Sequence, residues 1–332
     1  MSRSAPLIVA ASIVAGCASP PASSKAATPD TATAVQPVVI PHSETFRLQS
    51  QIVPQEFQIF VALPSNPQPG TTYPVIYALD ANGEFGTITE TVRLAGFGAP
   101  EIPPAVVVGI GYPVDGMEQT LNLRTRDYTP TNDTAFAAFA ASLWGDGEAP
   151  APGGAPAFLR FIKDELKPLI EQRYPVDPAD ATLIGHSFGG LFATYALFHE
   201  PGTFQRFVIA SPSLWWDHQV SLQYEKEYAA AHQDLAASVF VSVGGLETAA
   251  ELEKAIPSFP EPMKSAALDY YERNGWPEMV GLIEPFGRTL AGRKYPSLRL
   301  ATHVFPEETH SSVMSMIASR GLRQVFKQAP RQ

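Results

Sequence analysis

Cysteine is almost absent from this 332-residue chain, in which Cys17 is the single one. No disulfide can therefore form within the chain. Basic residues are also few: there are 23 Lys and Arg against 33 Asp and Glu, and the formal net charge is -10. They never form a run of five or more. This balance argues against nucleic acid or an anionic membrane surface as the main partner.

Metal-binding patterns are missing as well. The sequence contains no H-E-x-x-H motif, no cluster of histidines and no EF-hand loop. Such patterns supply the ligands of protein-bound zinc and calcium. The sequence therefore predicts no metal centre.

The apolar run near the N-terminus, at residues 5–15, is too short to cross a bilayer, which takes roughly 20 apolar residues. It follows a positively charged start and ends in small residues, as in a secretory signal peptide. Val14–Cys17 resembles the bacterial lipobox, in which the cysteine is lipidated and becomes the first residue. We therefore predict a lipoprotein signal peptide over residues 1–16 and a lipid anchor on Cys17. A plain cleaved signal peptide is the alternative.

These features predict a periplasmic location. Ala18 follows the cysteine, and under the enterobacterial sorting pattern a residue other than Asp at this position implies retention at the outer membrane. Residues 17–42 are rich in Ala, Ser, Thr and Pro. Such a segment cannot bury enough surface to offset its ordering entropy, so we predict a flexible tether. A folded domain is predicted over residues 43–332.

Apolar runs predict the strands of a sheet. Polar and apolar residues alternate over Ser43–Gln51 and Gln55–Leu63, which indicates two antiparallel strands. Tyr73–Leu79 and Ala105–Gly111 are apolar runs rich in Val and Ile, typical of strands buried on both faces of a largely parallel sheet. Further strands are predicted at Thr182–Ile184, Phe207–Ala210, Val239–Val243 and Leu298–Phe305.

Helices alternate with these strands. Apolar residues recur at helical spacing over Phe158–Tyr174, where Pro168 is expected to kink the helix. Further helices are predicted at Gly189–Phe198 and Ser311–Phe326. Strands that alternate with helices indicate an α/β domain with a mostly parallel sheet and helices on both faces.

An insertion interrupts this rhythm at residues 246–296. It contains two predicted helices, around Lys264–Asn274 and Met279–Gly292. Because it comes late in the sheet, we expect it to act as a helical lid or as the wall of a pocket.

The strongest motif spans Gly185–Gly190 and fits G-x-S-x-G. It follows a predicted strand and opens a predicted helix, which is the context of a nucleophile elbow. The sharp turn holds Ser187 in a strained conformation, and the glycines on either side remove side chains that would collide. We predict that Ser187 is a catalytic nucleophile. The alternative is an ordinary serine at a helix N-terminus.

A serine hydroxyl needs a base to take its proton. In hydrolases whose serine stands on such an elbow, the catalytic histidine comes last along the chain. His303 lies inside a predicted strand, whereas His310 follows that strand and precedes the final helix. His310 is therefore the predicted base. Glu247, just after the strand Val239–Val243, is the predicted acid, which would fix the imidazole tautomer. Asp217 is the second candidate.

Negative charge that develops in a transition state requires hydrogen-bond donors. The N–H of Phe188, the residue after the nucleophile, is one predicted donor, and the N–H of Ala81, in the loop after an early strand, is the other. Trp215 and Trp216 lie after the strand that follows the elbow. They are either core residues or an aromatic platform for a flat ligand.

From about residue 43 onward, the chain resembles the esterase family that includes enterochelin esterase and its periplasmic relatives. The resemblance rests on Tyr73–Asp80, Val108–Tyr112, Arg124–Pro130, the elbow and Ser211–Asp217. It implies the α/β-hydrolase fold. It also implies hydrolysis of siderophore ester bonds, such as those in the trilactone of a catecholate siderophore, without a cofactor.

The resemblance also implies that some members use serine and histidine alone, without an acid such as Glu247. Ala81 stands where relatives often have Gly, although Ala can still present its N–H. On this interpretation the chain is a periplasmic serine esterase that opens a ferric siderophore, and Arg124, Arg126 and Arg293 are candidates to contact the anionic chelate. One alternative is an esterase for feruloyl or acetyl carbohydrate esters, or a general carboxylesterase. The other is a ligand-binding lipoprotein without catalysis.

Overall fold

The computed structural model describes residues 37–98, 100–144 and 151–327. The predicted signal peptide, Cys17 and most of the predicted tether lie outside these residues. The compact unit begins at Ile40, close to the start predicted at residue 43. Within the described ranges, no helix is both long and apolar enough to cross a membrane.

Eight strands form one sheet in the order β1-β2-β4-β3-β5-β6-β7-β8. They are β1 (Ser43–Gln49), β2 (Glu56–Ala62), β3 (Tyr73–Ala78), β4 (Val106–Gly111), β5 (Val176–His186), β6 (Arg206–Ala210), β7 (Ser238–Gly244) and β8 (Arg299–Phe305). The pairs β1–β2 and β2–β4 are antiparallel, and all other neighbours are parallel. This order and these directions are those of the α/β-hydrolase fold, so the predicted fold class is confirmed.

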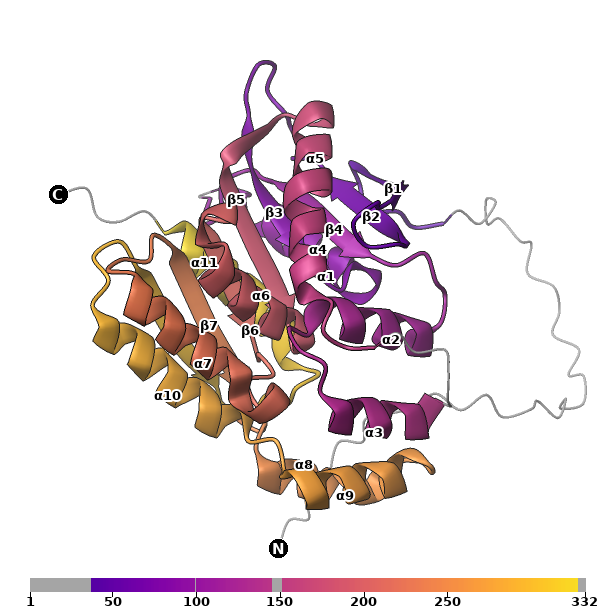
Figure 1. The fold of residues 1–332 in the computed structure, drawn as a ribbon. Coiled ribbons are helices and arrows are strands. Elements are labelled where there is room, and N and C mark those ends of the chain that lie inside the picture. The colour runs from indigo at the N-terminus through magenta and orange to yellow at the C-terminus, as the bar shows by residue number, and fades with distance from the viewer. Residues whose placement is uncertain (1–36, 99, 145–150, 328–332) are drawn as a thin grey trace, which may run out of the picture. The chain divides into compact units, whose positions relative to one another are not determined.

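Helices cover both faces of the sheet (Figure 1). They are α1 (Ala81–Ala95), α2 (Met117–Tyr128), α3 (Thr134–Trp144), α4 (Ala155–Phe161), α5 (Lys167–Arg173), α6 (Phe188–His199), α7 (Trp216–Ala231), α8 (Ala249–Ala255), α9 (Met263–Asn274), α10 (Met279–Arg293) and α11 (Val313–Phe326). Successive side chains of a strand point to opposite faces. Ile76 of β3 accordingly packs in the core that α1 and α11 share, and Tyr77 packs in the core under α4 and α6.

The predicted helix over Phe158–Tyr174 is present but is not regular. α4 and α5 are separated by a π-helical turn, Ile162–Leu166, and Pro168 lies in the first turn of α5. Proline has no N–H to bond the carbonyl of the preceding turn. The wider π-helical turn directly precedes the proline, at the point where the sequence predicts a kink.

Several helices were not expected from the sequence. The segment after β3 was expected to be a loop, but Asn82 and Gly83 lie in the first turn of α1. These are weak helix formers. α1 forms because Phe85, Ile88 and Val92 recur at helical spacing and are buried against the sheet. α2 was not predicted because its sequence is mostly polar and shows little apolar periodicity.

The insertion predicted over residues 246–296 is not one unit. α10 packs on the sheet through Ile283, Phe286 and Leu290, which are buried. A Cβ on Gly287 would lie 2.4 Å from Thr302 Cγ2 of β8, so the helix approaches the strand closely. α10 thus covers part of the sheet, and its predicted function as a lid or as the wall of a pocket stays a prediction. α9 instead packs beside α3, away from the sheet in Figure 1, and a lid function for α8 and α9 stays a prediction.

Candidate active site

Ser187 occupies a strained turn between β5 and α6. Its φ is 60° and its ψ is -116°, a region that residues other than glycine rarely adopt. Its N–H donates to the carbonyl of Ala210 (3.0 Å), and its carbonyl accepts from the N–H of Leu191 (2.9 Å). A Cβ on Gly185 would lie 2.4 Å from the carbonyl oxygen of Gly189, so only glycine fits there. The half-buried Ser187 thus stands on the elbow that the motif predicts.

The structure brings His310 and Glu247 together. His310 lies in the loop after β8, and its Nδ1 is 2.5 Å from Oε2 of Glu247. The carboxyl group of Glu247 is buried, and its other oxygen, Oε1, accepts from Ser211 Oγ (2.6 Å) and from the N–H of Gly244 (2.7 Å). Two predicted residues that lie 63 positions apart in the sequence therefore form one hydrogen-bonded pair. Asp217 makes no such contact with His310 in the described part of the chain.

Two contacts place this pair beside the elbow. The ring of His310 lies 4.5 Å, centroid to centroid, from the ring of His186, the residue before Ser187. The loop after β6 also joins the two, because Ser213 donates its N–H to the Ser187 carbonyl (3.2 Å) and Ser211 bonds Glu247. Among the described residues, no hydrogen bond runs from Ser187 Oγ to His310. Such bonds are often long before substrate binds.

Both predicted hydrogen-bond donors begin helices. Phe188 is the first residue of α6 and Ala81 is the first residue of α1. The first N–H groups of a helix have no acceptor within it. Neither of these two N–H groups meets an acceptor in the described residues. Both are therefore free to donate to a group that is not part of either helix.

Arg124 was predicted to contact substrate, but in the structure it bonds other residues of the chain. Its Nε and Nη2 donate to Oδ1 and Oδ2 of Asp80 at 2.7 Å and 3.0 Å, and Nη2 also donates to the carbonyl of His186 at 3.2 Å. Only 12% of its side chain is exposed. Arg124 thus links the turn before α1 to the end of β5, and so fixes the start of α1 relative to the start of α6.

The other predicted cations are also paired. Arg126 bonds the buried carboxylate of Asp127 at 2.6 Å and 2.9 Å. Burial raises the pKa of Asp127, and Arg126 opposes that shift. Arg293 bonds the buried Glu225 at 2.7 Å and 2.8 Å. All three arginines proposed for an anionic chelate therefore neutralise carboxylates of the chain itself, and the structure does not support their predicted role.

The two tryptophans differ. Trp216 is fully buried, and its Nε1 donates to Thr131 Oγ1 (3.1 Å), so it is a core residue. Trp215 is half-buried and lies 6.1 Å, between ring centroids, from Phe188 of the elbow. Of the two alternatives, the core position holds for Trp216, while Trp215 keeps a partly exposed ring next to the elbow.

Sequence reasoning missed two residues beside the elbow. His186 Nδ1 lies 3.6 Å from Oε1 of Glu84 on α1, and both side chains are largely buried. His186 is part of the motif itself, so its position next to Ser187 was a usable signal. Glu84 carried no such signal, because the burial of its carboxyl group depends on α1, which the sequence did not predict.

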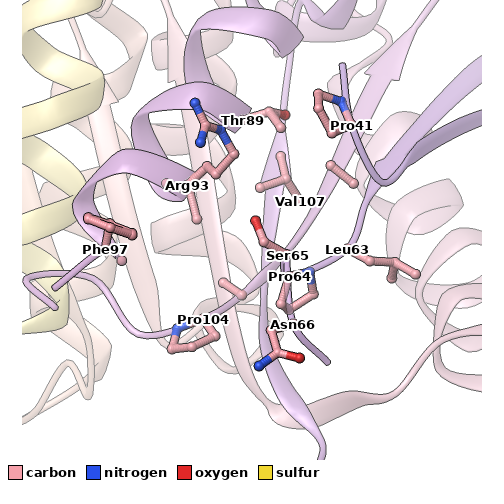
Figure 2. Close-up of a pocket in the computed structure, with 14 residues that line it drawn as sticks. Pro41, Leu63, Pro64, Ser65, Asn66, Thr89, Arg93, Phe97, Pro104 and Val107 are labelled. Atoms are coloured by element: carbon pink, nitrogen blue, oxygen red, sulfur yellow. The ribbon is translucent and has the colours of Figure 1, made fainter. Parts of the chain in front are cut away.

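A separate hollow of about 430 Å³ lies elsewhere on the molecule (Figure 2). It is lined by the second half of α1, including Thr89 and Arg93, by the segment after β2 and by the start of β4. None of the elbow, Glu247 or His310 lines it. In the described ranges no group of three or more His, Cys, Asp or Glu side chains could hold a metal ion.

The model of the family described as "Putative esterase" matches residues 50–275. The chain belongs to this esterase family. The esterase is 35% identical over 289 residues to the ferri-bacillibactin esterase BesA of Bacillus subtilis, covering 86% of this chain and 89% of that protein. It is 30% identical to the siderophore triacetylfusarinine C esterase of Aspergillus fumigatus, over 89% and 96% of the two chains.

Solved structures agree with this assignment. The crystal structure of the BES protein from Bacillus cereus matches with a TM-score of 0.71 at 29% identity, covering 90% of this chain and all of that one. The protein is therefore an enzyme that hydrolyses esters. This finding sets aside the alternative of a binding lipoprotein without catalysis.

Proposed function

We propose that the esterase is a serine hydrolase that cleaves the ester bonds of a siderophore, with Ser187 as nucleophile, His310 as base and Glu247 as acid. The observation that carries the proposal is the Glu247–His310 pair beside the strained elbow. A nucleophilic serine next to a histidine–carboxylate pair recurs in hydrolases of unrelated folds.

Each residue then has one task in the reaction. Glu247 accepts a hydrogen bond from the Nδ1–H of His310, which leaves Nε2 unprotonated and free to take the Ser187 proton as Oγ attacks the ester carbonyl. The N–H groups of Phe188 and Ala81 donate to the resulting oxyanion. His310 passes its proton to the departing alkoxide, and water then releases the acyl group from Ser187 by the same steps.

The substrate class comes from the relatives. Two of them are named as siderophore esterases, one for ferri-bacillibactin and one for triacetylfusarinine C. We propose a ferric catecholate siderophore as the substrate here. Since the arginines are already paired, the proposed contact is the partly exposed ring of Trp215, on which a catechol ring would stack.

Hydrolysis of ferric enterobactin by the purified chain tests this proposal. We expect ring-opened products in chromatography and none from Ser187→Ala. If the enzyme ignores every siderophore, iron-free trilactone included, yet cleaves feruloyl or acetyl carbohydrate esters, the substrate class is wrong and the serine mechanism stands. If a fluorophosphonate probe fails to label Ser187 in an active enzyme, the mechanism is wrong.

We also propose that the enzyme is anchored in the periplasm by lipid on Cys17, facing inward from the outer membrane. The lipobox-like Val14–Cys17 and the short apolar run before it support this proposal. Metabolic labelling with a radioactive fatty acid should mark the full chain expressed in bacteria, and Cys17→Ser should abolish the label. Fractionation with a soluble, unlabelled product would contradict the anchor.

A further inference from the structure

His186 forms one side of the space around the proposed base. It is the last residue of β5 and directly precedes Ser187. Its ring lies 4.5 Å from that of His310 with a tilt of 33° between the planes. The two histidines come from segments far apart in the sequence, so this contact is a product of the fold.

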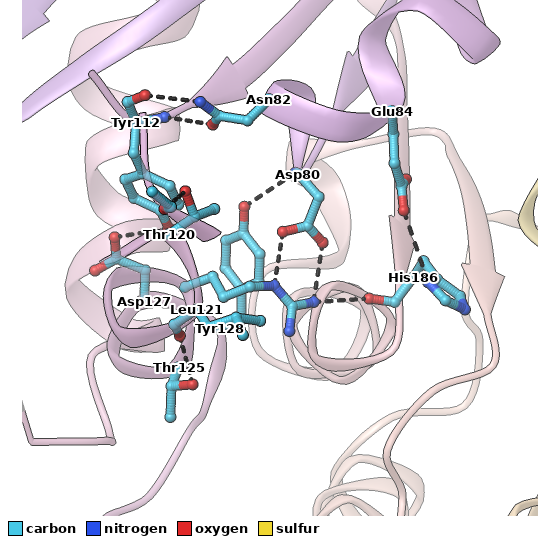
Figure 3. A network of polar contacts seen from close by, with 12 residues as sticks. Asp80, Asn82, Glu84, Tyr112, Thr120, Leu121, Thr125, Asp127, Tyr128 and His186 are labelled. Atoms are coloured by element: carbon cyan, nitrogen blue, oxygen red, sulfur yellow. Dashed lines mark hydrogen bonds and ion pairs between the residues drawn. The ribbon is translucent and has the colours of Figure 1, made fainter. Parts of the chain in front are cut away.

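Glu84 also lies next to His186 (Figure 3). Its Oε1 lies 3.6 Å from His186 Nδ1, which is longer than a hydrogen bond. Glu84 Oε2 and His186 Nε2 are both buried, and neither has a hydrogen-bond partner among the described residues. The His186 ring is thus enclosed between a carboxyl group and the His310 imidazole.

The charged groups that face His186 are Glu84 and Asp80 at the start of α1, Arg124 on α2 and His310 in the loop after β8. Asp80 and Arg124 neutralise one another through two hydrogen bonds. Burial raises the pKa of Glu84 well above its ordinary value, with Asp80 adding to this shift and Arg124 opposing it.

Burial also lowers the pKa of His186 well below its ordinary value. His310 and Arg124 add to this shift, and the His310 backbone opposes it. Near neutral pH His186 is therefore uncharged, and the ring next to the base carries no positive charge that would oppose protonation of His310.

We propose that His186 is a positioning residue, whose buried ring, packed beside Glu84, fixes the orientation of the His310 imidazole. Glu247 holds His310 through a single atom, Nδ1, and 45% of the His310 side chain is exposed. A ring fixed at one atom can still swing about that contact. Packing against His186 restricts this swing and aims Nε2 at the elbow. The inference rests on the proposed role of His310.

Removal of the ring should separate positioning from chemistry. For His186→Ala we expect kcat on 4-nitrophenyl acetate to fall by about tenfold to hundredfold with KM little changed, as expected when a catalytic group is misplaced by an ångström or less. His186→Phe keeps a flat ring without nitrogen atoms and should recover most of the activity. The pH dependence of kcat/KM for His186→Phe should match that of the wild type.

A matched control is His199→Ala. His199 is also stacked on a neighbouring ring, that of Tyr195 at 4.0 Å, but it ends α6 and so lies at the opposite end of that helix from the elbow. It should leave kcat unchanged. Should His186→Ala fail to fold, as judged by its circular dichroism spectrum, His186→Leu keeps the buried volume without a flat ring and should still lose activity relative to His186→Phe.

Two results would overturn the inference. Wild-type kcat in both His186→Ala and His186→Leu would show that the ring does not position His310. Equal losses in His186→Phe and His186→Ala would show that a nitrogen atom of His186 takes part directly. Either result leaves the proposed function intact, whereas a wild-type enzyme that cleaves no ester would refute the proposed function instead.

Discussion

Two glutamate–histidine pairs stand beside Ser187, and they differ in what surrounds each carboxyl group. Glu247 is 2.5 Å from His310, and its second oxygen accepts from a hydroxyl and a backbone N–H. Glu84 is 3.6 Å from His186, and its second oxygen meets no donor among the described residues. The carboxyl group of Glu247 is therefore surrounded by hydrogen-bond donors, whereas the second oxygen of Glu84 has none among the described residues.

The comparison shows that donors, and not burial alone, decide what a buried glutamate can do. Hydrogen bonds to a carboxylate favour its charged form, whereas burial without donors favours the protonated form. Glu247 is therefore suited to hold the imidazolium that forms on His310. Glu84 is suited to pack, and its raised pKa agrees with that role.

The largest effect should come from loss of His310. His310→Ala removes the base, and we expect kcat to fall by about 10⁴-fold or more. Steady-state hydrolysis of 4-nitrophenyl acetate measures the change, with His303→Ala on β8 as a control of the same residue type. An activity within tenfold of the wild type would mean that another group takes the Ser187 proton.

The two glutamates should then respond very differently to the same substitution. In Glu247→Gln the amide can donate to His310 Nδ1 and leave the wrong tautomer, so kcat should fall by roughly 10³-fold. Burial favours the protonated form of Glu84, and Gln is a neutral group of the same shape, so kcat should change by less than about threefold in Glu84→Gln. Similar kcat values for the two variants would mean that Glu247 and Glu84 contribute equally to catalysis. Full activity in Glu247→Gln would show that serine and histidine suffice alone.

A stability measurement tests the ion pair between Arg124 and Asp80. Arg124→Ala leaves Asp80 largely buried without its partner, so the free energy of unfolding should fall by about 3–5 kcal/mol. Arg47 pairs with Glu56 on the surface with 61% of its side chain exposed, and Arg47→Ala should cost less than about 1 kcal/mol. Urea unfolding measures both. Equal losses would mean that Arg124 contributes no more than a surface charge.

The smallest expected effects are on the pH dependence of stability, and they have opposite signs. The folded chain keeps a proton on Glu84 that the unfolded chain releases above its ordinary pKa of 4.5. The wild type should therefore lose stability relative to Glu84→Gln as the pH rises from 4.5 toward neutral. His186 stays neutral in the folded chain, whereas the unfolded chain takes up a proton below pH 6.5. The wild type should therefore lose stability relative to His186→Phe as the pH falls below 6.5.

Urea unfolding at several pH values would show these trends. Stability differences that do not vary with pH would mean that neither group titrates differently in the folded and unfolded chains. A trend of the reverse sign for Glu84→Gln would mean that Glu84 is charged in the folded enzyme.

Local patterns predicted the parts of the molecule that depend on local physics. The buried strands and the elbow at Ser187 could be read from apolar runs and glycine spacing. The order of residues along the chain identified Glu247 and His310, whose contact the structure then shows. Pairings between distant residues could not be read in this way. Arg124 seemed free for a substrate because its partner, Asp80, is 44 residues away in the sequence.

The position of β8 at the edge of the sheet has a consequence for inactivation. Within the described part of the chain β8 pairs with β7 alone, and His310 lies five residues beyond the end of β8. Edge elements open with less free energy than the centre of a fold. At low denaturant concentration, β8 and the following loop should therefore unfold before the centre of the sheet. The enzyme should then lose its activity while most of the molecule is still native.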